Sequence, residues 1–314
     1  MAHMQKDAEQ KAKEKSAKGD SNQKLALNEH KSANPPTSIK RSIKTTLTNI
    51  YRWIQVKLSQ KQRISKDTQR YTFTLPPLSK SLGLQTGQHI QVGFHFEDKL
   101  VTRPYTPVRP ILGIEDHNDK DKPNGTFDLL VKTYLPDQDQ PGGTMSNILD
   151  CMAEGEEIEI KGPSGAIRYF GNGRFAVDER EYVFDRVSFV LGGSGVTPGY
   201  QVLARILGNK DDKTEVKVIY ANRSEDDILL REDLDGFARE HGDRFSIAHV
   251  LSHPSEEWDG LKGHLDEKVI KDNVFAPRER NVVLLCGPPA MIQKAALPVL
   301  KDWGYDEDKN LFGF

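Results

Sequence analysis

The feature of the sequence that most constrains the fold is a short apolar run that leads directly into a glycine-rich loop. Residues 187–191 (VSFVL) are typical of a strand buried on both faces, and residues 192–198 (GGSGVTP) follow at once. Gly193 and Gly195 permit a tight turn and the close approach of a phosphate, and Pro198 suits the first turn of a helix. The standard dinucleotide motif has Gly or Ala in place of Pro198. A strand–turn–helix junction without a ligand therefore stays an alternative.

Strand-like and helical patterns alternate from this loop to the C-terminus. The expected strands are 215–220, 245–250 and 281–286, and the expected helical stretches are 203–206 and 233–239. Strands that alternate with helices form parallel sheets with helices on both faces. Residues 187–314 are therefore predicted to form a doubly wound α/β domain.

The preceding part of the chain has a different pattern. Its expected strands, separated by turns with Gly and Pro, are 53–58, 71–75, 89–92 and 127–131. One short helix is expected after Ser146. This pattern predicts an antiparallel barrel over residues 45–166, joined to the second domain by a linker at 167–186.

Residues 1–44 are predicted to be a disordered tail or linker. Residues 1–38 are rich in Lys, Gln, Ser and Ala and lack aromatic residues, so they cannot bury enough apolar surface to order themselves. The opening MAHM resembles a remnant of a cloning vector. No apolar leader or bilayer-length run is visible, so we expect a soluble, cytoplasmic chain with no membrane span. An upstream membrane anchor or further domain of the natural protein stays open.

Charge and residue counts exclude several classes of function. The formal net charge is -2 and no long basic stripe occurs, which argues against nucleic acid as a partner. The two cysteines, Cys151 and Cys286, cannot build a disulfide framework or hold an iron–sulfur cluster. The nine histidines show no metal-ligand spacing, so no protein-bound metal is expected.

Residues 103–108 (RPYTPV) combine groups that suit a phosphate and a planar ring. Arg103 offers a planar fork of donors, Tyr105 a flat ring that can lie on a flavin, and Thr106 a hydroxyl for a ring nitrogen. A surface arginine and a core tyrosine on an edge strand are the alternative.

Residues 142–149 (GGTMSNIL) join two glycines to a predicted helix start. Backbone amides at a helix N-terminus, with the helix dipole behind them, hold a phosphate well. An ordinary turn with Ser146 as the helix cap is the alternative.

Residues 286–291 (CGPPAM) follow a predicted strand, where ligands bind in open α/β sheets. A single cysteine in this place is more often a small buried hydrophobic residue than a reactive group. No partner that would make Cys286 a nucleophile is recognisable.

Together and in this order, the four segments resemble the ferredoxin–NADP reductase superfamily, in particular NADH–cytochrome b5 reductase and the C-terminal FAD/NADH module of eukaryotic nitrate reductase. The resemblance runs from about Trp53 to Phe314. Further local matches are 65–68 (SKDT), 87–90 (GQHI), 161–165 (KGPSG), 221–231 (ANRSEDDILLR) and 311–314 (LFGF). The resemblance implies a six-stranded antiparallel FAD-binding barrel followed by a doubly wound parallel-sheet NADH-binding domain.

The resemblance also implies roles for individual residues. The FAD site would comprise Arg103, Pro104, Tyr105, Thr106, Lys132, Tyr134, Gly143, Met145 and Ser146, with Phe314 near the flavin ring. The NADH site would comprise Gly193, Gly195, Thr197, Pro198, Asp227, Cys286, Gly287, Pro288 and Met291. Thr106, His89 and Cys286 would be the catalytic positions, with His89 and Thr106 as a route for the flavin proton. A hydrogen-bonded structural histidine is the alternative for His89.

Asp227 would favour NADH, because a carboxylate near the adenosine ribose repels the extra phosphate of NADPH. Arg223 argues weakly in the other direction. Leu135 stands where the superfamily often has an aromatic residue, the loop 109–125 is long, and the stretch 134–142 is short. These departures concern the adenine end of the FAD site.

The implied activity is that of an FAD-dependent NADH reductase. Hydride would pass from NADH to flavin N5, and single electrons would then pass to a haem acceptor such as cytochrome b5. A nitrate reductase module that serves its own haem domain, and a non-catalytic interaction module of the same fold, are alternatives. Lys61, Arg63 and Arg70 are candidates for docking an acidic partner, although solvated surface explains them as well.

Overall fold

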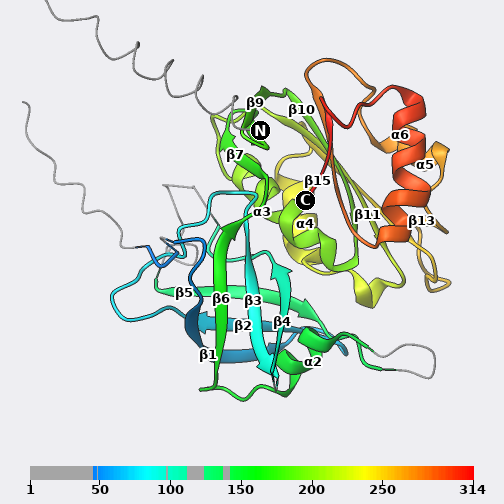
Figure 1. Cartoon of the computed structure of the whole chain (residues 1–314). Coiled ribbons are helices and arrows are strands. Elements are labelled where there is room, and N and C mark those ends of the chain that lie inside the picture. The colour runs from blue at the N-terminus through cyan, green and yellow to red at the C-terminus, as the bar shows by residue number, and fades with distance from the viewer. Residues whose placement is uncertain (1–44, 48, 97, 112–123, 137–141) are drawn as a thin grey trace, which may run out of the picture. The chain divides into compact units, whose positions relative to one another are not determined.

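A computed structural model of the chain describes residues 45–47, 49–96, 98–111, 124–136 and 142–314. The predicted disordered tail, residues 1–44, lies outside the described residues, as do parts of the loops 109–125 and 134–142 (Figure 1). From Thr45 onward, the described residues belong to one compact unit. The two predicted structural patterns correspond to two lobes within this unit.

The first lobe, called the barrel lobe, contains six antiparallel strands. They are β1 (Ile54–Arg63), β2 (Thr68–Thr74), β3 (His89–Phe96), β4 (Lys99–Tyr105), β5 (Thr126–Lys132) and β6 (Glu157–Ser164). Their order in the sheet is β4-β3-β6-β1-β2-β5. The sheet closes where the chain beyond β4 meets β5, since Val108 and Arg109 each share a 2.9 Å backbone hydrogen bond with Asp128. The predicted six-stranded barrel is confirmed.

Alternation of side chains along the strands fills the interior of the barrel. In β1, Val56 and Leu58 point inward between exposed neighbours, as period-two patterning requires. Phe73 and Phe127 stack inside with ring centroids 5.4 Å apart. Helix α2 (Thr144–Cys151) adds Met145 and Leu149 to the same core. The helix expected after Ser146 thus begins two residues before it, because Gly143 is the N-cap.

The second lobe, called the α/β lobe, contains a six-stranded parallel sheet. Its strands are β10 (Arg186–Gly192), β11 (Glu215–Asn222), β12 (Phe245–Leu251), β13 (Leu261–Lys262), β14 (Asn281–Cys286) and β15 (Leu311–Gly313). They lie in the order β13-β12-β11-β10-β14-β15. The chain order reverses between β10 and β14, so the crevice beyond the carboxyl ends of these two strands is the expected ligand position.

Helices cover both faces of this sheet, which confirms the doubly wound arrangement (Figure 1). Helices α3 (Val196–Leu207) and α4 (Arg231–Glu240) share one core with Val282 and Leu284 of β14. Helices α5 (Glu267–Asn273) and α6 (Leu297–Trp303) share the opposite core with Val283 and Leu285. The strand is apolar throughout because both of its faces are buried.

The predicted linker 167–186 contains a small antiparallel sheet. Its strands are β7 (Ile167–Gly171), β8 (Arg174–Val177) and β9 (Arg180–Val183). Tyr169 and Phe175 from this sheet pack into the core that holds α3. The segment is therefore folded against the α/β lobe, and the residues at which each domain begins and ends stay a prediction.

His249, on β12, is a buried polar group inside this lobe. Its ring lies 5.9 Å from the ring of Tyr220 and 6.4 Å from that of Trp258, measured between centroids. The described residues supply no hydrogen-bond partner to either ring nitrogen, although Asp235 Oδ1 lies 3.7 Å from Nε2. Burial lowers the pKa of His249 below its ordinary value, and Asp235 opposes only part of this effect.

We predict that His249 makes the fold sensitive to acid. A histidine held neutral in the folded state binds more protons when unfolded, so its stabilisation is present above about pH 6.5 and is lost below that pH. Urea titrations at about pH 7.5 and about pH 5.5 measure the change. The unfolding free energy of the wild type should fall by about 1 kcal/mol more than that of His249→Phe between the two pH values. Exposed His264, replaced by Gln, is the control, and equal losses for His249→Phe and wild type would contradict the prediction.

Candidate active site at the seam between the lobes

Gln201, on α3, joins the two lobes at their seam. It is 2% exposed, and its side chain bonds to backbone atoms of the barrel lobe. The amide oxygen accepts from the Gly87 N–H, and the amide nitrogen donates to the carbonyls of Gln88 (3.4 Å) and Pro107 (3.3 Å). Gln88 precedes His89 and Pro107 follows Thr106, so one buried amide fixes the backbone beside two predicted catalytic residues.

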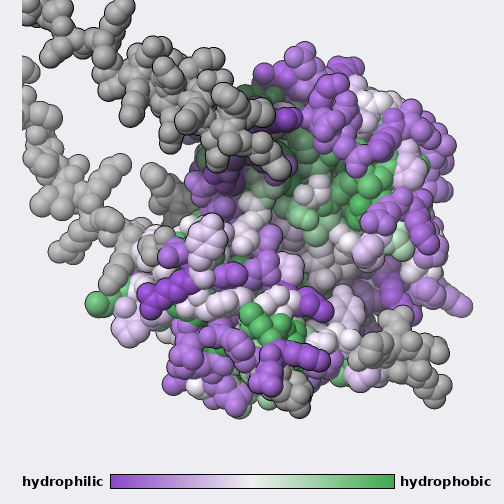
Figure 2. Space-filling model, in the orientation of Figure 1, coloured by the Kyte–Doolittle hydropathy of each residue, from purple (hydrophilic) through white to green (hydrophobic). Residues whose placement is uncertain are grey.

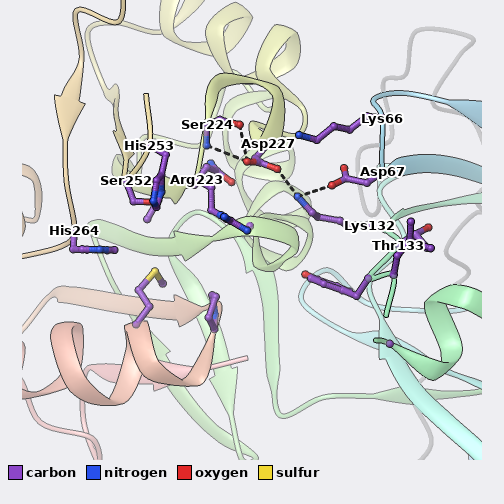
Figure 3. Close-up of a pocket in the computed structure, with 18 of the residues that line it drawn as sticks. Lys66, Asp67, Lys132, Thr133, Arg223, Ser224, Asp227, Ser252, His253 and His264 are labelled. Carbon is purple, nitrogen blue, oxygen red and sulfur yellow. Dashed lines mark hydrogen bonds and ion pairs between the residues drawn. The ribbon is translucent and has the colours of Figure 1, made fainter. Parts of the chain in front are cut away.

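A cleft of about 1030 Å³ lies between the lobes beyond the ends of the parallel strands. The barrel lobe contributes Lys66, Asp67, Lys132, Thr133, Tyr134, Leu135, Gly142 and Gly143 to its walls. The α/β lobe contributes the ends of β10, β11 and β12 and the loop after β14, through residues that include Gly193, Arg223, Asp227, His253, Pro288 and Met291. Figure 3 shows the two sets of side chains facing one another across the cleft.

The glycine-rich loop packs backbone against backbone at the switch point of the sheet. A Cβ atom on Gly195 would lie 2.6 Å from the Cys286 carbonyl oxygen and 2.8 Å from the Gly287 nitrogen. A Cβ atom on Gly192 would lie 2.8 Å from the sulfur of Met291. Gly193 has a φ of +51° and no atom within 4 Å of such a position, so its surface stays open toward the cleft. The loop can therefore admit a phosphate close to its backbone.

A second set of backbone amides lies at the N-terminus of α2. Gly143, the N-cap, makes no side-chain cap, and the first turn contains no acidic residue. The Ser146 hydroxyl donates to the Gly143 carbonyl (2.9 Å) and accepts from the Tyr134 N–H (3.2 Å), so it holds the loop rather than capping the helix. Met145 is a core residue whose side chain faces the barrel interior. The amides of this turn have the polarity that a pyrophosphate requires.

The RPYT segment lies at the end of β4. The Arg103 guanidinium is exposed and donates to the neighbouring Thr102 carbonyl (2.7 Å). Among the described residues it has no carboxylate partner, so it is available to an anion. Burial raises the pKa of Tyr105 to about 12, which keeps its ring neutral. The segment thus presents a cation beside a neutral aromatic ring.

His89 is the first residue of β3, and Thr106 directly follows the last residue of β4. The two strands are antiparallel neighbours, and their pairing begins with Ile90 opposite Tyr105. Burial lowers the pKa of His89, so its ring is neutral at neutral pH. Its Nε2 lies 3.5 Å from the side-chain amide nitrogen of Gln91. A proton route through His89 and Thr106 stays a prediction.

Residues of the two lobes also meet near the predicted nicotinamide position. The hydroxyl of Tyr134 lies 3.5 Å from that of Ser194 in the glycine-rich loop. Thr197 is buried and donates to the Ser194 carbonyl (3.2 Å). Burial raises the pKa of Cys286 to about 11, so its thiol stays protonated and is unsuited to nucleophilic attack. Phe314, the last residue, donates its N–H to Leu285 beside Cys286 (3.1 Å).

Lys132 forms an ionic bridge between the lobes. Its ammonium, on β5, donates to Asp227 of the α/β lobe and lies 3.1 Å from Asp67 Oδ2 in the β1–β2 turn (Figure 3). Burial disfavours the charged lysine, but the bonds to Asp227 and Asp67 outweigh burial and raise the pKa of Lys132. Burial likewise opposes the charge on Asp227, yet the bonds from Lys132 and Ser224 lower its pKa. Lys132 and Asp227 are therefore both charged at neutral pH.

Seven of the predicted site residues line the cleft itself: Lys132, Tyr134, Gly143, Gly193, Asp227, Pro288 and Met291. The others are not among the residues that line it: His89, Arg103, Pro104, Tyr105, Thr106, Met145, Ser146, Gly195, Thr197, Pro198, Cys286, Gly287 and Phe314. The sequence prediction missed Gln201 and Asp67. A glutamine flanked by Tyr200 and Val202 in the predominantly apolar helix 196–207 was the available signal for Gln201. Asp67 was part of a quoted motif but received no role.

Two of the three candidate docking residues are used within the barrel lobe. Lys61 donates to the carbonyls of Asp150 and Met152 (3.3 Å to the latter), and Arg63 donates to the Lys66 carbonyl (2.9 Å). Arg70 Nε is buried without a hydrogen-bond partner among the described residues. On the face drawn in Figure 2, hydrophilic residues cover most of the surface, and hydrophobic residues gather near β15 and α6. None of these features identifies a docking surface.

Two searches of the described residues gave negative results. None of the helices in that part of the chain is long and apolar enough to cross a membrane. Nor do those residues include a group of three or more His, Cys, Asp or Glu side chains placed to hold a metal ion.

Comparison with known proteins identifies the family. Residues 55–169 match the oxidoreductase FAD-binding domain and residues 189–296 match the oxidoreductase NAD-binding domain. NADH-cytochrome b5 reductase 3 of Rattus norvegicus is 38% identical over 263 residues, which are 81% of this chain and 84% of the rat protein. The chain belongs to the family of FAD- and NAD-binding oxidoreductases that includes NADH-cytochrome b5 reductase.

Nitrate reductases contain a similar region. Nitrate reductase [NADH] of Spinacia oleracea is 40% identical over 264 residues, but the match covers 83% of this chain and only 27% of that protein. The cytochrome b5 reductase domain of Ulva prolifera nitrate reductase superposes with a TM-score of 0.78 at 32% identity, covering 86% of this chain and all of that domain. The chain therefore spans about a quarter of the spinach protein and the whole of the reductase domain from Ulva.

The residues at the seam fit the two cofactors of the family. For FAD, the amides at the start of α2 and the exposed Arg103 guanidinium suit phosphates, and Gly143 has no room for a side chain, since a Cβ would lie 2.6 Å from Ser146 Oγ. For NADH, Gly193 and the N-terminus of α3 offer a second phosphate position. We assign the cofactor contacts of single residues as a proposal.

We predict that Gly195→Ala impairs NADH binding while FAD is retained. The added methyl would push the glycine-rich loop away from the Cys286 carbonyl, and a displacement of about 1 Å at such a site can cost up to about 100-fold in rate. The KM for NADH should rise by about tenfold or more, with flavin absorbance per protein unchanged.

Gly236→Ala is the matched control, because a Cβ there would lie 3.8 Å from its nearest neighbour, the end of the flexible Arg239 side chain. A KM for NADH that stays at the wild-type value in Gly195→Ala would refute the assignment of the loop.

Proposed function

We propose that this oxidoreductase is an FAD-dependent NADH reductase that delivers electrons to a haem acceptor of the cytochrome b5 type. The observation that carries the proposal is the pairing of two anion-binding backbone turns, at Gly143 and Gly193, on opposite walls of one cleft. Two phosphate-bearing cofactors can thus approach one another at the seam. Bound FAD would supply the redox chemistry by accepting hydride from NADH and releasing electrons singly.

The protein itself contributes binding, orientation and exclusion of water. Gln201 holds the backbone beside His89 and Thr106, and Tyr134 and Ser194 meet across the seam. The neutral thiol of Cys286 and the neutral ring of Tyr105 add no charge where the two rings would meet. Positioning of this kind can account for most of the acceleration of a transfer between stacked rings.

A haem domain of the same polypeptide is the second candidate acceptor. The similarity to spinach nitrate reductase, of which this chain spans about a quarter, and to the reductase domain from Ulva supports it. In that case the chain would act as the reductase module of a longer enzyme. An interaction module without flavin, the third alternative, is disfavoured because the free guanidinium of Arg103 and the uncapped α2 would have no anion to bind.

Purified protein should be yellow and should oxidise NADH with ferricyanide, faster than it oxidises NADPH. Adding cytochrome b5 separately tests the haem acceptor by its reduction spectrum. Reduction of ferricyanide but not cytochrome b5 would favour a haem partner within a longer chain. Failure to oxidise NADH with any acceptor, once FAD has been supplied, would overturn the proposal.

We predict that Arg103→Gln weakens FAD binding. Loss of a charge-assisted hydrogen bond to phosphate costs about 1.5–3 kcal/mol. The dissociation constant for FAD should therefore be about tenfold to hundredfold larger. Flavin released on dilution and gel filtration, measured by fluorescence, should rise accordingly. Arg174→Gln, at the exposed first residue of β8, is the control, and an unchanged FAD affinity in Arg103→Gln would contradict the prediction.

A further inference from the structure

We propose that Asp67, a residue of the barrel lobe, determines the preference for NADH over NADPH by acting through Lys132 on Asp227. The inference rests on the proposed function, in which the adenosine ribose lies near Asp227. Asp227 follows β11, the strand next to the glycine-rich loop, which is where dinucleotide-binding sheets place the carboxylate that contacts the ribose. The new element is that a residue from the flavin-binding lobe belongs to this specificity site.

Three charged groups from three segments form the site. Lys132 Nζ bonds to Asp227 Oδ1 and lies 3.1 Å from Asp67 Oδ2, and all three side chains are largely shielded, with exposures of 17%, 11% and 22% for Lys132, Asp227 and Asp67. Asp67 and Lys132 line the same cleft as Asp227. No other cation is paired with either carboxylate among the described residues.

Local hydrogen bonds hold both carboxylates in place. Oδ1 of Asp67 accepts from the hydroxyls of Ser65 (3.2 Å) and Thr68 (3.3 Å), while its backbone carbonyl accepts from the Thr133 N–H (2.6 Å). Oδ2 of Asp227 accepts from the N–H (3.0 Å) and hydroxyl (2.8 Å) of Ser224. Lys132 is therefore shared between two fixed anions and cannot move toward one without leaving the other.

The balance of charge gives Asp67 its effect. Two carboxylates and one ammonium leave the cluster with one net negative charge, which repels the additional phosphate of NADPH. Without the Asp67 charge, Lys132 would neutralise Asp227 completely and the repulsion would weaken. Arg223, which lines the same cleft and has no carboxylate partner among the described residues, would then attract the phosphate with less opposition (Figure 3).

The alternative is that the cluster only braces the two lobes against each other. A brace would affect stability and would change the use of NADH and NADPH in parallel. A specificity site would change the ratio of the two, mainly through KM, because the 2′-phosphate takes no part in the chemical step. The ratio therefore separates the two roles.

The test compares wild type, Asp67→Asn, Asp67→Ser and Asp227→Asn as flavin-loaded full-length proteins with ferricyanide as acceptor. Asp67→Asn should raise the ratio of kcat/KM for NADPH to that for NADH by about three- to tenfold at low salt, and less at high salt. Asp98→Asn, an exposed carboxylate of the barrel lobe, is the matched control and should leave the ratio unchanged. The double variant of Asp67 and Asp227 should change this ratio by less than the product of the two single changes, because both carboxylates act through Lys132.

Equilibrium binding of 2′,5′-ADP and 5′-AMP to the oxidised protein gives a second readout that needs no turnover. The affinity for 2′,5′-ADP relative to 5′-AMP should rise in both Asp67 variants. Unchanged relative affinities and an unchanged kinetic ratio, in variants that remain folded and yellow, would overturn the inference. Absence of NADH oxidation by the wild type would instead overturn the proposed function, and the binding experiment would still decide the role of Asp67.

Discussion

The contact between the barrel lobe and α3, the helix that follows the glycine-rich loop, is the constraint on which the rest of the site depends. Gln201 is buried at the seam, and a buried amide left without partners would cost about 1–3 kcal/mol. Three backbone groups of the barrel lobe satisfy it, and each adjoins a predicted functional segment. Val108 and Leu130 of the barrel extend the same core beneath the seam. The packing of α3 against the barrel lobe therefore holds the two lobes together at the seam.

Electrostatics divide the cleft into regions with different tasks. The starts of α2 and α3 lack acidic residues, so backbone dipoles can favour phosphates there. Near the predicted ring positions, burial keeps Tyr105, His89 and Cys286 neutral. Elsewhere in the cleft, Lys132 forms ion pairs with Asp67 and Asp227. In the proposed function, binding, chemistry and cofactor choice would thus depend on separate groups held by one seam.

The agreement between prediction and structure depended on how local each signal was. The strand predicted at 281–286 coincides with β14, because a continuous apolar run bounded by turn residues is a local signal. β4 was not recognised as a strand, since its burial shows no clean alternation. Tyr169 and Phe175 sit in a segment predicted to be a linker, and only packing against the α/β core explains their burial. Lys132 was predicted to belong to the FAD site, and in the structure its ammonium forms ion pairs with two carboxylates.

The sequence by itself determined the two lobes, their order, and the glycine-containing turns at Gly143 and Gly193, because periodicity and glycine spacing act over a few residues. Only the tertiary structure decided which of these turns share a cleft, and that Gln201 and Asp67 belong to it. Asp67 and Asp227 are far apart in the chain, and nothing local in either segment indicates the lysine they share. Such contacts arise from the packing of one lobe against the other, which no short stretch of sequence encodes.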